Sequence, residues 1–184
     1  DYDPPIPKYF RLFNAEEIEG IPELTLNTLP ESEITEIADG FIETSECPIK
    51  ETAQDKAFYH LEDDTIYLPI RESFKSDLSF LGVTMHEMGH STGHPSRLNR
   101  ALQNPKGSEK YALEELRVEL ASLFIHADLG IELDREHYQD HSNYLLSWTK
   151  ALKEEPRILF SVCRDAQAIC DHLIDNYEKE YGKL

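Results

Sequence analysis

The chain of 184 residues has few of the features that mark secreted, membrane-spanning or nucleic-acid-binding proteins. It contains 3 cysteines and no Cys-x-x-Cys pair, which favours free thiols and a reducing cytoplasm. No apolar run reaches about 18 residues, so no segment is expected to span a membrane. Lys and Arg total 18 against 36 Asp and Glu, and the net charge of −18 repels nucleic-acid phosphates and anionic lipids.

The residues that are abundant fit one folded domain. A chain with 40% hydrophobic and 29% charged residues is typical of a single globular core at this length. It starts at Asp1 without a Met or a signal peptide, so we expect residues 1–184 to be a single-domain fragment of a longer protein. Between Leu12 and Ile49 there are ten acidic and no basic residues, and we interpret this stretch as a solvated surface.

Hydrophobic periodicity predicts an α+β fold. Short strands are expected at 9–13 and at 58–61 and 65–68, the last two forming a hairpin, and an amphipathic helix is expected at 31–41. Longer helices with capping or breaking residues at their ends are expected over Ser76 to Gly93, Ser108 to Gly130, His137 to Lys153, and from Pro156 onward. Strands therefore precede most helices, which indicates the α+β class. In the last helix, Cys163 and Cys170 are both expected to be buried.

His86, Glu87 and His90 form an H-E-x-x-H motif inside the expected helix from Ser76 to Gly93. Residues four apart share a helix face, so both imidazoles can reach one metal ion from the same side. Glu87 would lie beside the metal, where a carboxylate can accept a proton from a metal-bound water. The motif therefore predicts a zinc site with hydrolytic chemistry.

A catalytic zinc needs a third protein ligand. The position ten residues after His86, where metzincins have a histidine, is Ser96. Glu115 and Glu119 lie four apart on the next expected helix and share a face, and two carboxylates inside a helix interface are costly unless they meet a cation. We predict that Glu115 binds the metal and that Glu119 hydrogen-bonds a ligand histidine, with the reverse assignment left open.

Other polar residues near the motif have two interpretations each. His94 either hydrogen-bonds within the turn that ends the helix or faces the substrate. His126 extends the polar stripe of the two glutamates and is either a further metal ligand or a histidine satisfied by other hydrogen bonds. The strand 65–68 either offers a backbone edge to an extended peptide or is an ordinary sheet strand. The basic stretch from Arg97 to Lys110 either receives an acidic ligand group or is a solvated loop.

Segments along nearly the whole chain resemble the C-terminal zincin-like metallopeptidase domain of ArdC-type antirestriction proteins, found on plasmids, conjugative elements and phages. The similar segments extend well beyond the H-E-x-x-H motif and include 9–14 (YFRLFN), 64–69 (DTIYLP), 84–94 (TMHEMGHSTGH), 97–100 (RLNR) and 111–116 (YALEEL). The wider likeness is to gluzincin-type and ImmA/IrrE-type proteases.

The resemblance implies a zincin-like fold, with a small N-terminal sheet packed against a mostly helical C-terminal part that contains the active-site helix. It implies that His86 and His90 are metal ligands, that Glu87 is the catalytic glutamate and that the helix of Glu115 and Glu119 supplies the third ligand. The implied metal is Zn²⁺, with Mn²⁺ or another divalent ion as the alternative. Family members usually have an N-terminal single-stranded-DNA-binding domain with no counterpart here, so DNA binding is expected from a missing domain.

Three functional hypotheses follow from the motif and the resemblance. The leading one is a zinc-dependent metallopeptidase that hydrolyses a protein or peptide substrate in the cytoplasm with a metal-activated water. The second is a module that binds metal without hydrolysing peptides, in a parent protein that protects incoming DNA by occlusion. The third is a narrow-specificity regulatory protease of the ImmA/IrrE type. An intact motif is compatible with all three.

Overall fold

The computed structural model describes residues 29–131, 148–149, 152–153 and 155–183. The expected strand at 9–13 and most of the expected helix at 137–153 lie outside them. In chain order the elements are α1 (Glu31–Glu43), β1 (Ile49–Thr52), β2 (Phe58–His60), β3 (Thr65–Pro69), a 3-10 turn η2 (Arg71–Ser73), α2 (Asp77–Ser91), α3 (Glu109–Asp128) and α6 (Ile158–Tyr181). The α+β class is confirmed. None of the described helices combines the length and hydrophobicity needed to cross a bilayer.

Serine side chains cap the two helices that carry the H-E-x-x-H motif and the glutamate pair. The side chain of Ser76 accepts a hydrogen bond of 3.2 Å from the backbone N–H of Ser79 at the start of α2. Ser108 accepts one of 3.2 Å from the N–H of Tyr111 at the start of α3. Each bond satisfies an N–H that has no partner within the first helical turn. Both predicted helix starts are confirmed.

The sheet has the strand order β1-β3-β2, with β3 parallel to β1 and antiparallel to β2. The predicted hairpin of β2 and β3 is confirmed. However, β3 is the central strand, and both of its edges are hydrogen-bonded to neighbouring strands. The idea that this strand offers an edge to a peptide is therefore wrong, and among the described residues the outer strands β1 and β2 each have one unpaired edge.

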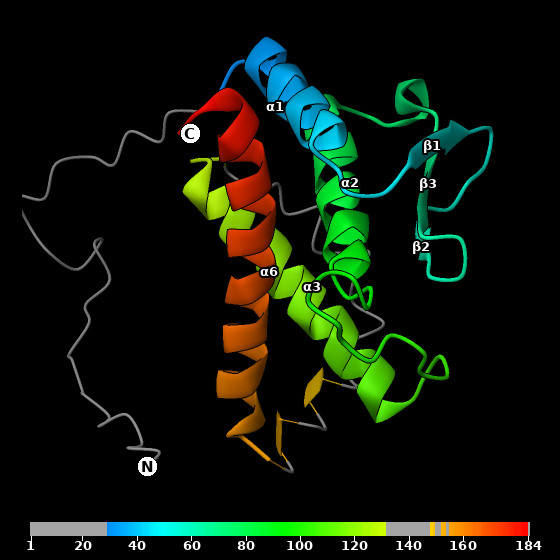
Figure 1. Cartoon of the computed structure of the whole chain (residues 1–184), viewed down its shortest axis with the longest axis vertical. Coiled ribbons are helices and arrows are strands. Elements are labelled where there is room, and N and C mark those ends of the chain that lie inside the picture. Colours follow the sequence, from blue (N-terminus) through cyan, green and yellow to red (C-terminus); the bar gives the residue numbers. More distant parts are fainter. Residues whose placement is uncertain (1–28, 132–147, 150–151, 154, 184) are drawn as a thin grey trace, which may run out of the picture.

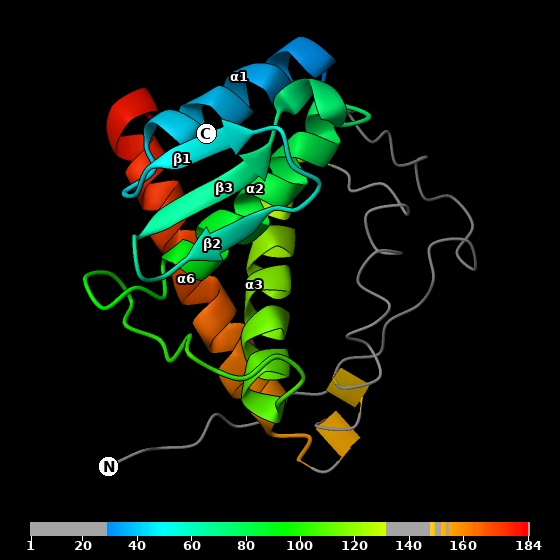
Figure 2. The same ribbon diagram turned by 90° about the vertical axis from the view of Figure 1, so that its right-hand side faces the viewer.

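Helix α2 lies at the centre of the fold, between the sheet on one side and the pair of α3 and α6 on the other (Figure 1). After a quarter turn the strands are seen in order, with β1 nearest α1 and β2 farthest from it (Figure 2). A helix in this position has neighbours on several sides. This explains why most of the α2 residues from Phe80 to Ser91 are buried.

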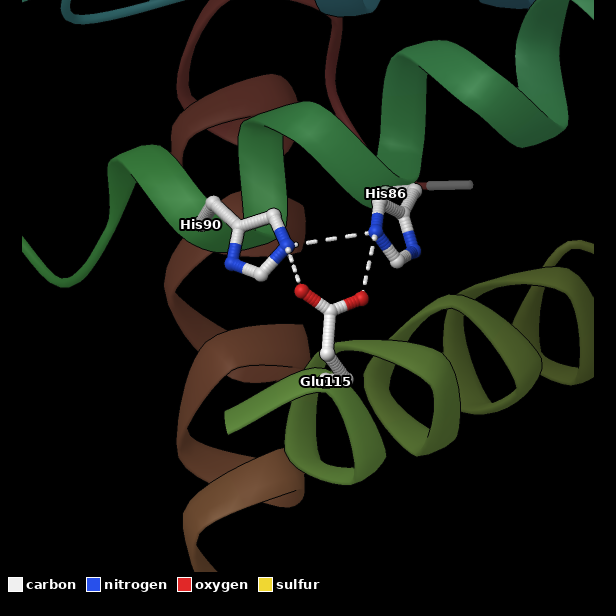
Figure 3. A group of neighbouring side chains, drawn as sticks. All are labelled: His86, His90 and Glu115. Carbon is white, nitrogen blue, oxygen red and sulfur yellow. Dashed lines mark hydrogen bonds and ion pairs between the residues drawn. The ribbon is translucent and has the colours of Figure 1, made fainter. Parts of the chain in front are cut away.

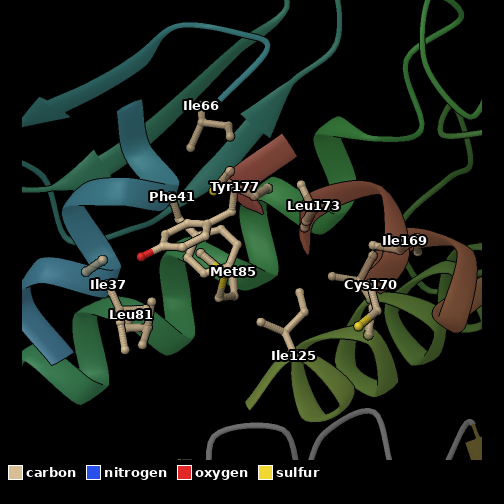
Figure 4. Packing of buried hydrophobic residues seen from close by; sticks show 14 of the residues in the cluster. Ile37, Phe41, Ile66, Leu81, Met85, Ile125, Ile169, Cys170, Leu173 and Tyr177 are labelled. Carbon is tan, nitrogen blue, oxygen red and sulfur yellow. The ribbon is translucent and has the colours of Figure 1, made fainter. Parts of the chain in front are cut away.

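The main hydrophobic core fills the space between these layers (Figure 4). Ile66 of β3, Met85 of α2, Ile125 of α3 and Ile169 of α6 are at most 1% exposed, so every layer contributes to one core. Burial of such a side chain stabilises the fold by about 1.5–3 kcal/mol. Because Met85 directly precedes His86, the packing of this core also fixes the rotation of α2 about its axis.

The three cysteines are free thiols, and they differ in burial. Cys47 and Cys170 are buried, but Cys163 is only half-buried, so the predicted burial of Cys163 is wrong. At this level of α6 the fully buried residue is Val162. Cys163 lies about 100° further round the helix, at the edge of the contacting face.

We predict that Gly89→Ala destabilises the fold, because α2 approaches α3 closely at this residue. A Cβ atom on Gly89 would lie 2.8 Å from Cγ1 of Val118, well inside van der Waals contact. Overpacking of this kind costs about 1–3 kcal/mol, to be measured as a loss in the free energy of unfolding in urea. In a Val118→Ala background the clashing methyl groups are gone, so the same substitution should cost less. An equal cost in both backgrounds would contradict the close-contact explanation.

Candidate metal site and adjoining cleft

His86 and His90 lie one turn apart on the face of α2 that meets α3 (Figure 3). Their ring centroids are 4.8 Å apart, and the rings are nearly perpendicular at 81°. Their Nε2 atoms are 3.2 Å apart. Two imidazole nitrogens therefore converge on one small volume, as the four-residue spacing predicts.

Glu115 reaches the same volume from α3 (Figure 3). Its Oε1 lies 3.5 Å from Nε2 of His90, and its Oε2 lies 3.7 Å from Nε2 of His86. The ligand atoms of the three residues all lie within 4.8 Å of one another. Two imidazoles and one carboxylate are a typical protein ligand set of a catalytic zinc, and a carboxylate only 5% exposed needs a cation nearby. The residues therefore fit a divalent metal ion.

Glu119 lies one turn further along α3 and faces the other nitrogen of His86. Its Oε1 is 2.9 Å from Nδ1 of His86, and the two side chains are only 12% and 15% exposed. A proton on Nδ1 that points to this carboxylate leaves the lone pair of Nε2 directed toward Glu115. The geometry favours Glu115 as the ligand and Glu119 as the partner of a ligand histidine, and this assignment stays a prediction.

Carboxylates surround His86 and shift its protonation. Burial lowers the pKa of the imidazole, but the hydrogen bond to Glu119 and the charges of Glu87, Glu119 and Glu115 outweigh it and raise the pKa to about 9. At neutral pH, His86 of the metal-free protein is therefore a positively charged imidazolium, with a proton on each ring nitrogen. A metal ion has to displace one of these protons, since only the neutral imidazole binds metal.

A cleft of about 390 Å³ opens over these residues. Glu87 is 7% exposed and lines it together with both histidines and Glu115. The other walls come from the segment that leads into β2, from β2 itself, from the loop before α3 and from the first turns of α3, and they include Lys56, Phe58, Tyr59, Leu102, Lys106, Tyr111 and Glu114. Lys106 belongs to the basic stretch, and Tyr111 and Glu114 to the similar segment 111–116, whereas no functional signal in the sequence marked Lys56, Phe58, Tyr59 or Leu102.

Arg100 joins the end of α2 to the start of α3. Its Nη2 donates to the carbonyl of Gly89 at 2.8 Å and to Oε1 of Glu114 at 2.8 Å, and its Nη1 donates to Oγ1 of Thr92 at 2.7 Å. Burial raises the pKa of Glu114, but hydrogen bonds from His90 and Arg100 outweigh this effect and lower the pKa to about 2. Glu114 is thus an anion held beside the two metal-ligand candidates His90 and Glu115.

Arg97 makes a second ion pair, in which its own side chain is buried and that of Asp64 is 31% exposed, and it joins the hairpin to the end of α2. Its Nη1 donates to Oδ2 of Asp64 at 3.0 Å, and its Nε donates to the carbonyl of Ser91 at 2.7 Å. Tyr59, a wall residue of the cleft, donates to Oδ1 of Asp64 at 2.6 Å. The two arginines of the basic stretch therefore hold the structure together and are not solvated, whereas Lys106 and Lys110 are exposed.

Two further histidines lie outside the metal-site group. His94 follows the end of α2, where its Nδ1 accepts a hydrogen bond of 3.2 Å from the backbone N–H of Ser96. It is not among the residues that line the cleft, so a substrate-facing role stays a prediction without support from the geometry. His126 is buried two turns beyond Glu119, with Nδ1 2.7 Å from the carbonyl oxygen of Ser122.

The fold and the site define a class of protein. A family model described as zincin-like metallopeptidase matches residues 36–165, a span that contains the sheet, α2 and α3. The chain belongs to this family, and the zincin-like arrangement of a small sheet against a helical part is confirmed.

Two curated bacterial proteins are similar to most of this chain. DNA primase TraC of Escherichia coli is 40% identical over 169 residues, which are 92% of this chain and 16% of that protein. The uncharacterized protein y4eC of Sinorhizobium fredii is 33% identical over 162 residues, 88% of this chain and 52% of that protein. The chain thus spans about half or less of the curated relatives it matches.

Crystal structures of the antirestriction protein ArdC from the R388 plasmid match this fold. The Mn(II)-bound form matches with a TM-score of 0.69 and 32% identity over 90% of this chain, and the metal-free form with 0.68 and 31% over 91%. In both comparisons 60% of the ArdC chain is covered. The resemblance to ArdC-type proteins is confirmed, and a relative with this fold binds a divalent metal ion.

We predict that Arg100→Met costs about 3–5 kcal/mol of folding free energy at pH 7, because it leaves the buried Glu114 without its closest cation. Adding Glu114→Gln should recover part of this loss, since it removes the uncompensated charge. In the wild type the lowered pKa means that Glu114 contributes stability above its ordinary pKa of 4.5, and this contribution is lost as pH falls toward about 2. Urea unfolding at several pH values measures both effects, and equal losses in the single and double variants would contradict the ion-pair explanation.

We predict that metal affinity rises with pH up to about 9, because His86 must release a proton before it binds. The raised pKa also stabilises the metal-free fold fully below about pH 6.5, and this stabilisation is lost as pH rises through about 9. Glu119→Gln removes one carboxylate that raises the pKa, so the rise in affinity should move to lower pH. Calorimetric titration with Zn²⁺ or Mn²⁺ across this range measures it. An unmoved pH profile would show that Glu119 does not act on His86.

Proposed function

We propose that the chain is a metal-dependent peptidase domain, with zinc as the preferred metal. The observation that carries this proposal is the convergence of His86, His90 and Glu115 beside a buried Glu87 at the floor of one cleft. A catalytic zinc ion typically has three protein ligands and one coordination position left open for water or substrate, and these three side chains match that ligand set. The Mn(II)-bound form of ArdC supports a divalent metal here and makes Mn²⁺ the alternative ion.

His86, His90 and Glu115 would hold the ion. When bound, such an ion polarises a substrate carbonyl and lowers the pKa of water to about 7. Glu119 would hold the ring of His86 in the orientation that presents Nε2 to the cleft, and its negative charge would make that nitrogen a stronger donor.

Glu87 is the proposed proton carrier. Its carboxylate lines the cleft beside both histidines, so it lies within reach of a water molecule that attacks a bound peptide. It accepts the proton of that water and passes it to the amine that leaves. Glu87 is only 7% exposed, so few bulk water molecules can hydrogen-bond to its carboxylate.

The outer edge of β2 is the proposed docking strand for the substrate backbone. Phe58 and Tyr59 of this strand line the cleft, and the edge opposite β3 has no partner among the described strands. An extended peptide that pairs with such an edge passes along the cleft wall, with its side chains alternating toward and away from it.

A second candidate is a module that binds metal without cleaving peptides and that belongs to a longer protein protecting DNA. The names of two relatives favour it, since DNA primase TraC and the antirestriction protein ArdC are both named for work on DNA. In this case the metal would stabilise the interface of α2 and α3, and Glu87 would be dispensable.

We predict that Glu87→Gln keeps its metal and loses peptide hydrolysis by a factor of about 10²–10⁴, the usual contribution of a general base. Metal content by mass spectrometry and cleavage of a quenched fluorescent peptide library test this, with His86→Ala as the variant that should lose metal and activity together. Unchanged hydrolysis by the metal-replete Glu87→Gln protein would sink the proposed mechanism. If neither the wild type nor Glu87→Gln cleaves any peptide, and Glu87→Ala still protects DNA in a restriction assay, the second candidate is favoured.

A further inference from the structure

Two lysines line the cleft although acidic residues outnumber basic ones by 36 to 18. Lys56 comes from the segment before β2, and Lys106 comes from the loop before α3. Both are exposed, and the structure gives neither an ion pair with another described residue. By contrast, Arg97 and Arg100 in the same region are paired with Asp64 and Glu114.

Two of the three carboxylates that line the cleft are engaged by other groups, and the third, Glu87, lies beside the two histidines. Glu114 is held by Arg100, and Glu115 lies within 3.7 Å of the Nε2 atoms of both ligand histidines. A bound divalent ion would add further positive charge to the floor of the cleft. Lys56 and Lys106 are therefore exposed positive charges in the cleft that pair with no described carboxylate.

Part of the excess negative charge lies away from the cleft, on α1. Helix α1 has acidic residues in its first turn and no basic residue in its last turn. It lies at the side of the sheet farthest from β2 (Figure 2). Charges beyond about 8 Å are largely screened at physiological ionic strength. An acidic group that enters the cleft therefore meets Lys56 and Lys106 at closer range than the carboxylates of α1.

The basic surface continues past the cleft. A neighbouring hollow shares Asn104 with it and is lined by Lys110 and Arg117. Lys110 is exposed and has no ion pair with a described residue, whereas Arg117 is 2.9 Å from Asp165. Space for a second acidic group therefore exists beside the first.

We propose that the cleft selects peptides with acidic side chains close to the scissile bond, held by Lys56 and Lys106; this rests on the proposed peptidase function. An acidic peptide fits better than a nucleic acid for two reasons. Proteins that bind phosphate backbones strongly make about 6–10 phosphate contacts, and only a few lysines are free here. The unpaired edge of β2 also offers a ladder of backbone donors and acceptors that matches another peptide backbone, whereas the phosphates of an oligonucleotide can only accept hydrogen bonds.

The test uses two labelled peptide libraries, randomised alike except that one has Glu and the other Gln at fixed positions. Binding to the metal-loaded Glu87→Gln protein is followed by fluorescence anisotropy, so the result does not depend on cleavage. We expect the Glu library to bind about five- to tenfold more tightly, as two exposed ion pairs allow. Lys56→Glu/Lys106→Glu should abolish this preference.

The matched control is Lys179→Glu/Lys183→Glu, which changes the net charge equally at the exposed end of α6. It should keep the preference for Glu. Equal binding of both libraries, or the same loss in both double variants, would overturn the inference. If a single-stranded oligothymidylate displaces the Glu library at lower concentration than the library itself binds, the patch serves nucleic acid and the inference is also overturned.

Cleavage by the unmutated protein separates this inference from the function on which it rests. Cleavage of both libraries at equal rates, with equal binding, leaves the peptidase function standing and removes the charge selectivity. Tighter binding of the Glu library without any cleavage leaves an acidic-peptide site in a protein that is no peptidase.

Discussion

The contact between α2 and α3 is the interaction on which the rest of the structure depends. Gly89 allows the two helices to approach until the methyl groups of Val118 fill the space where a Cβ would be. At that separation the imidazoles of α2 meet the carboxylate of Glu115 on α3 at 3.5–3.7 Å. A wider separation would leave the same residues present but too far apart to share one ion.

A helix interface with three glutamates and two histidines is an expensive one, because buried charges lose their hydration. The structure compensates them in two ways. Arg100 neutralises Glu114 permanently and also binds the carbonyl of Gly89, so it fastens both helices at the point of closest approach. Glu115 and Glu119 are compensated by the histidines, and through them by a proton or a metal ion. Folding, protonation and metal binding are therefore coupled at one interface.

The charge distribution connects this interface to the proposed substrate. Helix α1, with acidic residues in its first turn, lies nearest the β1 edge of the sheet (Figure 2), whereas Lys56 of the cleft comes shortly before β2, the strand at the other edge. The same sheet supplies the unpaired edge at which an extended peptide would pair. Arg97 binds Asp64 of the hairpin and the carbonyl of Ser91 at the end of α2, so it helps to fix the position of that edge relative to the two histidines.

The local elements were predictable because local signals specify them. Ser76 and Ser108 mark helix starts through hydrogen bonds within one turn, and the spacing of His86 and His90 requires only that the chain be helical. The pairing of Glu115 with Glu119 on one face follows from the same periodicity. The order of the strands did not follow, because a parallel partner for β3 comes from β1, across a connection whose path no local pattern records.

What depended on the whole fold is the contact between groups that are distant in the chain. The sequence identified the motif residues but could not tell which glutamate meets the Nε2 atoms and which meets Nδ1 of His86, since that depends on how α3 is rotated against α2. It also gave no reason to separate Arg97 and Arg100 from Lys106, although the first two are buried ion-pair partners and the third lines the cleft. Helical periodicity acts over a few residues, whereas burial and ion pairing are decided by the neighbours that packing supplies.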